Sequence, residues 1–191
     1  MSEKKQYTIV IQNTYHQNIN SVEPEFWKKK KLEQMNEQEW ELLCDGCGKC
    51  CLNKLESDGK IYFTCVKCRF LDSKSCLCRI YENRFEKVPD CRSVNFAALK
   101  ERPRWLPKTC AYRLLEEGKD LPQWHPLISG DKESVHKAMQ SVRGRLLISE
   151  TEVKDDEYEN YINESVMLNT CDNFIDANKH RVGANGEGRL C

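Results

Sequence analysis

Cysteine is the residue type whose number and spacing in this sequence indicate chemistry. The chain has 191 residues and 12 cysteines. Between residues 44 and 110 they form a stepped array, with Cys65 as an additional thiol inside it: Cys44, Cys47, Cys50, Cys51, Cys68, Cys76, Cys78, Cys91 and Cys110. Thiols gathered this densely either cross-link a chain as disulfides or hold metal as thiolates.

The compartment decides between these two chemistries. The longest apolar runs, residues 9–11 and 146–148, are far shorter than the roughly 20 residues that span a bilayer. The first residues, 1–5, are not followed by the apolar region of a signal peptide. We therefore expect a cytoplasmic protein, and in that reducing environment clustered cysteines are more often metal ligands than structural disulfides.

The spacing Cys44-Asp-Gly-Cys47-Gly is typical of zinc knuckles and of several iron–sulfur sites. Cys50 and Cys51 are adjacent, and adjacent side chains diverge. We therefore expect them to serve two centres, or one polynuclear centre. Two closed sites of four thiolates would use eight cysteines, whereas one iron–sulfur cluster would use four and leave the others to a zinc site or to packing.

The remaining candidates are weaker. Cys110 lies near the start of a predicted helix, where a thiolate is favoured, and we favour a ligand role for it. His125 either packs through hydrogen bonds or has a functional role, as a nitrogen ligand or a proton shuttle. Cys171 and Cys191 stand apart from the array as free thiols. Since the sequence has no phosphate-binding loop, dinucleotide fingerprint or metalloprotease helix, we assign no catalytic residue and favour a role other than catalysis.

The elements that must position these thiols are short. We expect an α+β fold, a small cysteine-rich and metal-stabilised domain with short helices, short strands and long loops. Asp58-Gly59 predicts a hairpin, Asn36 with Glu39 predicts a capping box, and Cys76 with Cys78 predicts an extended segment with both thiols on one face. A strand is predicted at 7–11 and another at 145–149; helices are predicted from residue 23 onward and at 80–86, 95–101, 109–117 and 132–139.

Composition divides the chain into three parts. Residues 1–22 are a polar N-terminal extension, 23–150 the cysteine-cluster metal-binding domain, and 151–191 an acidic and disordered C-terminal extension. Lysine plus arginine and aspartate plus glutamate balance at 30 each. We therefore expect no unspecific binding to nucleic acid or to an anionic membrane, since both require a positive surplus.

The array also has a familiar context. The sequence resembles the bacterial YcgN cysteine-cluster proteins in its central motif, Cys44-Asp-Gly-Cys47-Gly-x-Cys50-Cys51-Leu52. The resemblance extends to Phe26-Trp27 and Glu39-Trp40 before the motif, and to Trp105-Leu106-Pro107-x-Thr109-Cys110 and Trp124-His125-Pro126-Leu127 after it. The YcgN proteins are related to the YkgJ-type C-x-x-C-x-x-C-C domain. The likeness covers roughly residues 25 to 150. The sequence departs from that pattern in Cys65, in a longer lead-in and in the tail after about 165.

The resemblance implies zinc or iron chelation, with no assigned biochemical role. Our first hypothesis is a metal-binding protein that holds zinc or iron, as single ions or as an iron–sulfur cluster, through the nine thiolates. The alternatives are an iron–sulfur redox protein or enzyme, a metal-shaped protein-interaction module and a metal-delivery protein. A metal ion is thus the expected partner, with a protein partner left open.

Overall fold

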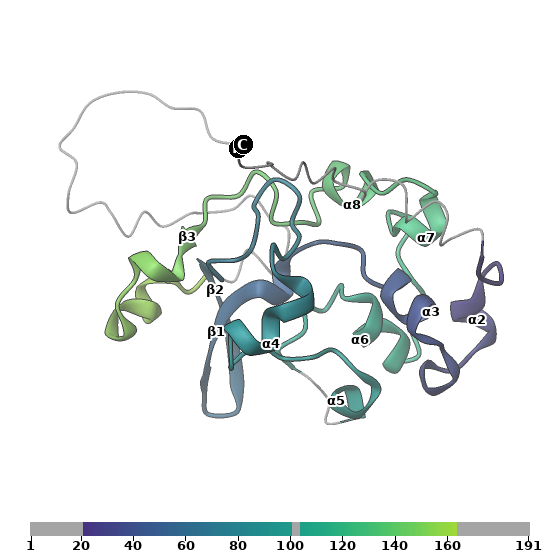
Figure 1. Cartoon of the computed structure of the whole chain (residues 1–191), viewed down its shortest axis with the longest axis horizontal. Coiled ribbons are helices and arrows are strands. Elements are labelled where there is room, and N and C mark those ends of the chain that lie inside the picture. Colours follow the sequence, from purple (N-terminus) through teal and green to yellow (C-terminus); the bar gives the residue numbers. More distant parts are fainter. Residues whose placement is uncertain (1–20, 101–103, 164–191) are drawn as a thin grey trace, which may run out of the picture.

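The computed structural model describes residues 21–100 and 104–163, in which short helices lie beside one small sheet (Figure 1). This confirms the α+β prediction. The α-helices are α2 (Phe26–Lys29), α3 (Glu37–Leu42), α4 (Arg84–Lys87), α5 (Phe96–Lys100), α6 (Ala111–Glu116), α7 (Pro126–Ser129) and α8 (Ser134–Lys137). Short 3-10 helices cover Leu32–Gln34, Lys49–Cys51, Tyr81–Asn83, Glu150–Glu152 and Asp155–Tyr161.

The sheet is built on the predicted hairpin. Strands β1 (Leu52–Ser57) and β2 (Lys60–Lys67) pair antiparallel, and β3 (Ile148–Ser149) adds to β2 in parallel. Asp58 and Gly59 both have positive φ, 51° and 69°. A two-residue turn of this kind matches the twist of the two strands, which explains why the chain reverses here.

The larger apolar core joins the helices on one side of the molecule. Trp40 of α3 lies over Tyr112 of α6, with ring centroids 5.0 Å apart. Asn36 caps α3 through the predicted capping box with Glu39. The buried members of this helical core are Phe26, Trp27, Leu32, Leu42, Leu43, Leu99, Leu106, Ala111, Tyr112 and Leu121. Their burial stabilises helices that are too short to persist alone.

A smaller core lies under the hairpin side. Leu52, Leu71, Cys76 and Val142 are its buried residues, with Cys51 and Leu147 packed against them. The N–H of Val142 donates to the carbonyl of Cys47 at 2.9 Å. This bond joins the small core to the cysteine-bearing turn.

The packed region continues past residue 150, where the sequence predicts a disordered extension. Glu150 accepts a hydrogen bond from the Arg69 guanidinium at 2.8 Å. Ile162 bridges Thr64 of β2, and the N–H of Asn163 donates to the carbonyl of Phe63 at 2.8 Å. The acidic segment is therefore held by backbone bonds to β2 as far as residue 163.

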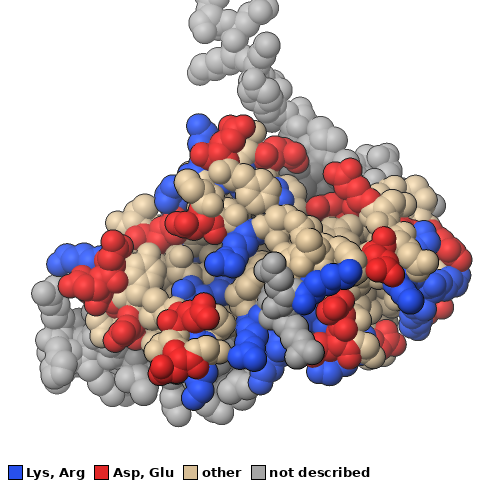
Figure 2. Space-filling model, turned by 90° about the horizontal axis from the view of Figure 1, so that it is seen from below, with Lys and Arg blue, Asp and Glu red and all other residues tan. Residues whose placement is uncertain are grey.

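Several predictions concern the chain outside the described residues, namely the strand at 7–11, the tail beyond 163 and the thiols Cys171 and Cys191. Within the part that is described, none of the helices has the length and apolarity needed to cross a membrane. Basic and acidic side chains are interspersed on the face shown in Figure 2, as the balanced composition suggests.

Candidate metal centre

The first set of thiols lies where the end of α3 meets the start of α6. Cys44 follows α3, and Cys110 is the N-cap of α6. The Tyr112 hydroxyl donates to the carbonyl of Trp40 at 2.9 Å, which ties the two helices together. Cys110 is thereby brought toward the turn at 44–50, although more than 50 residues separate them in sequence.

Electrostatic effects identify the neighbours within this set. Burial raises the pKa of Cys44 and of Cys47 well above the usual value, and negative charge on Asp45, Cys50 and Cys110 raises both further. Burial raises the pKa of Cys110 to about 12, again with contributions from Asp45 and Cys50. Because such effects fade with distance, these thiols are neighbours. We call Cys44, Cys47, Cys50 and Cys110 the first thiol group.

Exposure within the first thiol group is uneven. Cys47 is buried and Cys110 is half-buried, whereas Cys44 and Cys50 retain exposed surface. Desolvation is nevertheless the largest influence on the pKa of Cys44.

The second set of thiols is gathered by backbone hydrogen bonds near the base of the hairpin. The N–H of Cys68 donates to the carbonyl of Cys51 at 2.9 Å. Cys78 forms a β-bridge with Leu71, whose own N–H donates to the carbonyl of Cys68 at 3.0 Å. These bonds place Cys51, Cys68 and Cys78 on neighbouring segments.

Cys91 reaches the same place from the loop after α4. The Arg69 guanidinium donates to the carbonyl of Lys87 at 3.2 Å, and this holds the loop against the segment that follows β2. Burial raises the pKa of Cys91, the Arg84 cation lowers it, and negative charge on Cys78, Cys68 and Cys50 raises it. We call Cys51, Cys68, Cys78 and Cys91 the second thiol group.

The two groups meet at the adjacent pair Cys50 and Cys51, whose Sγ atoms lie 4.0 Å apart. Hydrogen bonding from Cys51 lowers the pKa of Cys50 to about 7, and the same contact raises the pKa of Cys51 strongly. The contact therefore favours the thiolate at Cys50 and the neutral thiol at Cys51. The pair lies where the two groups meet.

A half-buried cation lies at this junction. The Lys54 ammonium donates to the carbonyl oxygens of Cys50 (2.8 Å) and Leu52, and it lies 4.9 Å from the centre of the Phe63 ring. Burial lowers the pKa of Lys54 to about 8, whereas negative charge on Cys50 and Cys51 opposes that shift. A cation in this position stabilises thiolates on either side of it.

Cys65 and Cys76 stand outside both thiol groups. Burial raises the pKa of each, and at Cys76 hydrogen bonding from Ser141 and the Arg143 cation oppose the rise. Cys76 is buried in the small core, and its thiol donates weakly to the carbonyl of Ser73 at 3.9 Å. Its φ of 59° is left-handed. The segment is thus not extended at Cys76, and it differs from the prediction that Cys76 and Cys78 share one face of a strand.

Gly48 allows the cysteine turn to approach the rest of the protein. Its φ is 74°, and a Cβ there would lie 2.8 Å from Val142 Cγ2 and 3.2 Å from Cys76 Cβ. Gly46 also has positive φ, 73°, but a Cβ at that position would meet nothing within 4 Å. Gly48 is therefore required for its small size as well as for its backbone conformation.

His125 packs through hydrogen bonds, one of its two predicted roles. It is fully buried, its Nδ1 accepts from the N–H of Leu127 at 3.1 Å, and its Nε2 lies 3.1 Å from the carbonyl of Leu43. These partners place the proton on Nε2. Because both ring nitrogens already have partners, neither is available to a metal.

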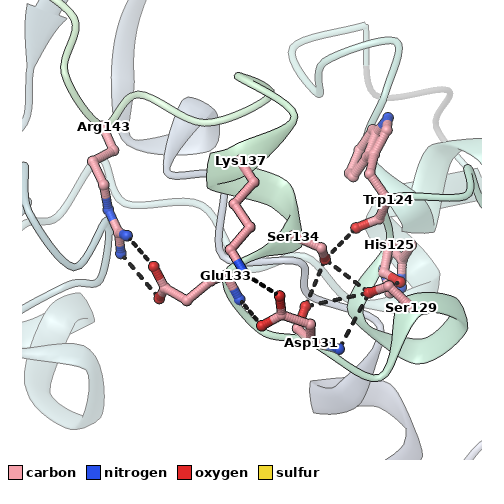
Figure 3. Close-up of polar contacts among 8 residues, drawn as sticks. All are labelled: Trp124, His125, Ser129, Asp131, Glu133, Ser134, Lys137 and Arg143. Atoms are coloured by element: carbon pink, nitrogen blue, oxygen red, sulfur yellow. Dashed lines mark hydrogen bonds and ion pairs between the residues drawn. The ribbon is translucent and has the colours of Figure 1, made fainter.

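The segment around His125 is held by a polar network (Figure 3). The Ser134 hydroxyl donates to the carbonyl of Trp124, and Lys137 pairs with Asp131 at 2.7 Å. Arg143 pairs with Glu133 and donates from Nε to the carbonyl of Lys74 at 2.6 Å. The network fixes the loop whose Val142 covers the cysteine turn.

One charged residue of this site, Asp45, was not among the residues predicted from the sequence, whereas the neighbouring Lys49 was predicted to balance thiolate charge. Lys49 is fully buried, and Asp45 is 9% exposed. Asp45 Oδ1 accepts from the N–H of Cys47 at 2.9 Å, whereas Oδ2 is buried with no hydrogen-bond partner. The position of Asp45 in a turn could have identified it, because the side chain of an aspartate in a turn commonly accepts a hydrogen bond from the backbone N–H two residues later, here that of Cys47.

Within residues 21–100 and 104–163, no three His, Cys, Asp or Glu side chains converge closely enough to hold a metal ion in the conformation observed. The donor set nevertheless fits a metal. Each thiol group offers four soft sulfur donors, the set that zinc and iron–sulfur clusters prefer. The orphaned Oδ2 of Asp45 beside the first group is an anion without a hydrogen-bonding partner.

The fold and the site define a small α+β protein rich in cysteine, and the chain belongs to the UPF0260 family. The UPF0260 protein of Rhizobium etli (strain CIAT 652) is 55% identical over 139 residues, which cover 72% of this chain and 87% of the relative. Those of Azotobacter vinelandii and of Pseudomonas aeruginosa (strain LESB58) are 52% and 53% identical over 143 residues, or 74% of this chain and 94% of each relative. No protein-family model and no solved structure matches the chain.

Proposed function

We propose that this protein binds zinc or iron through its two thiol groups, each of which forms one metal centre. The observation that supports the proposal is that contacts between distant segments bring the thiols together: the Tyr112 hydroxyl joins α6 to α3, the N–H of Cys68 donates to the carbonyl of Cys51, and the Cys50 and Cys51 Sγ atoms lie 4.0 Å apart. The resemblance to YcgN-type cysteine-cluster proteins supports the same chemistry. Cys65 and Cys76 have packing roles in this proposal.

Binding requires the thiols of each group to turn toward a common point and to lose their protons. Burial opposes the thiolate form in the metal-free protein, and the Lys54 cation favours it at the junction. A bound metal supplies the missing positive charge and cross-links distant segments. A structural zinc site contributes on the order of 10 kcal/mol to folding, whereas an iron–sulfur cluster would add reversible electron transfer.

The proposal also favours the cytoplasm, because a reducing compartment keeps unpaired thiols available for metal. All ten cysteines within the described part of the chain are free thiols.

Metal analysis of the full chain purified without air tests the proposal, with absorption spectra to distinguish colourless zinc from brown iron–sulfur clusters. We expect Cys47→Ser and Cys78→Ser each to lose about half of the bound metal, because each removes one of two centres. Cys65→Ser is the control and keeps the full content. Metal-free wild-type protein, or unchanged content in both test variants, would contradict the proposal.

A further inference from the structure

Asp45 occupies an unusual position for a carboxylate. It lies between Cys44 and the turn to Cys47, it is 9% exposed, and its Oδ2 is buried without a hydrogen-bond partner. Its other oxygen, Oδ1, already holds the turn by accepting from the N–H of Cys47 at 2.9 Å. An asparagine would hold the same turn through the same oxygen without a buried charge.

A buried carboxylate oxygen without a partner is costly, because the charge loses its hydration and gains nothing in return. Asp45 also lies among groups that are negative when ionised, Cys44, Cys47 and Cys110. Lys49 is the cation on which its charge acts. The position becomes favourable when a multivalent cation lies among these thiols.

Asp45 is joined directly to the cysteine turn, because its Oδ1 accepts from the N–H of Cys47 at 2.9 Å and its buried Oδ2 has no hydrogen-bond partner. The Cys50 thiol, in turn, lies 4.0 Å from Cys51 at the edge of the second group. A tetrahedral centre takes four donors, and the first group with Asp45 offers five.

We infer that Asp45 Oδ2 is a metal ligand of the first centre, where it takes the fourth position beside Cys44, Cys47 and Cys110 while Cys50 stays at the junction with Cys51. This inference rests on the proposed metal binding and refines it. The first centre then has three sulfur donors and one oxygen donor, and the second has sulfur donors alone. The harder oxygen makes the first centre the more tolerant of divalent ions other than zinc.

Asp45→Asn and Cys50→Ser distinguish the two candidates for the fourth position. Full-length protein would be stripped of metal and titrated with Zn²⁺ against a chelating dye. We expect Asp45→Asn to weaken the first site by more than about 100-fold, since loss of even an outer partner costs 10- to 100-fold, and Cys50→Ser to leave that site within about tenfold. Cobalt substitution supplies a second readout. The intensity of the sulfur-to-cobalt charge-transfer band of the first site should correspond to three bound thiolates, both in the wild type and in Cys50→Ser.

The stability of the metal-free protein separates a ligand from a merely structural carboxylate. If Asp45 binds metal, Asp45→Asn removes an uncompensated buried charge, and the thermal unfolding midpoint of the metal-free protein stays equal or rises while that of the metal-loaded protein falls. If Asp45 instead serves to balance Lys49, both midpoints fall. A lowered unfolding midpoint for metal-free Asp45→Asn would overturn the inference. So would loss of metal from the first site in Cys50→Ser together with its retention in Asp45→Asn. A wild-type protein that binds neither Zn²⁺ nor Co²⁺ would instead refute the proposed function itself.

Discussion

The two thiol groups are positioned by different parts of the molecule and by different forces. The first depends on side-chain packing, because the helical core joins α3 to α6 and so brings Cys110 to the cysteine turn. The second depends mainly on main-chain bonds at Cys51, Cys68 and the bridge at Cys78, with one side chain, Arg69, holding the loop of Cys91. We therefore expect truncation of buried side chains to disturb the first group. The second group should respond mainly to substitutions that alter the backbone conformation.

A matched pair of leucines tests this contrast with the largest expected effect. Leu43 precedes Cys44 and is fully buried in the helical core, whereas Leu77 precedes Cys78 and is 45% exposed. We expect Leu43→Ala to lower the free energy of unfolding by about 4 kcal/mol, and Leu77→Ala to change it by less than about 0.5 kcal/mol. Urea denaturation of both variants measures the difference, and equal losses would contradict the contrast.

The burial of the first group also predicts a dependence on pH in metal-free protein. The pKa of Cys110 is raised to about 12 in the folded state, above its ordinary value of about 8.5. Between these values the unfolded chain holds fewer protons than the folded one. The stability supplied by the neutral thiol is therefore present below about pH 8.5 and is lost as pH rises toward 12, by up to about 5 kcal/mol.

Denaturation of metal-free wild type and Cys110→Ser from pH 8 to 11 checks this expectation. The variant should lose less stability with rising pH, since it lacks the titrating group. Parallel pH profiles for the two proteins would mean that burial at Cys110 does not govern the response.

The two glycines of the cysteine turn sharpen the contrast at backbone level. Gly48→Ala combines positive φ with a Cβ only 2.8 Å from Val142 Cγ2, and we expect a loss of about 3 kcal/mol. Gly46→Ala has the same backbone strain in open space and should lose about 1 kcal/mol. Thermal unfolding in the presence of a chelator compares them, and a smaller loss at Gly48 than at Gly46 would refute the close approach.

The smallest expected effect concerns the helix that leads into the first group. Asn36 caps α3 by accepting from the N–H of Glu39, and Asn36→Ala should cost about 1 kcal/mol. Asn83 occupies the N-cap of α4 without a side-chain cap, so Asn83→Ala should stay within about 0.5 kcal/mol. Chemical denaturation of the two variants would show similar midpoints if capping at α3 were unimportant.

Local signals predicted much of the fold. The hairpin at Asp58 and Gly59 and the capping box at Asn36 depend on residues a few positions apart, so the sequence contains the whole interaction. The helix predicted at 109–117 is present as α6, and the one at 95–101 as α5. The sequence predicts disorder from residue 151, but residues 151–163 are packed in the structure. Their order comes from pairing with β2, which lies about 100 residues earlier in the chain.

The sequence by itself determined that this protein concentrates its thiols, because the number and spacing of the cysteines need no fold to be read. Only the tertiary structure decided how the thiols divide, since Cys110 reaches the first group through helix packing and Cys91 reaches the second through Arg69. It also revealed the buried Asp45, whose Oδ2 has no hydrogen-bond partner. The physical reason is that proximity and desolvation arise from contacts between distant segments, which spacing along the chain does not encode.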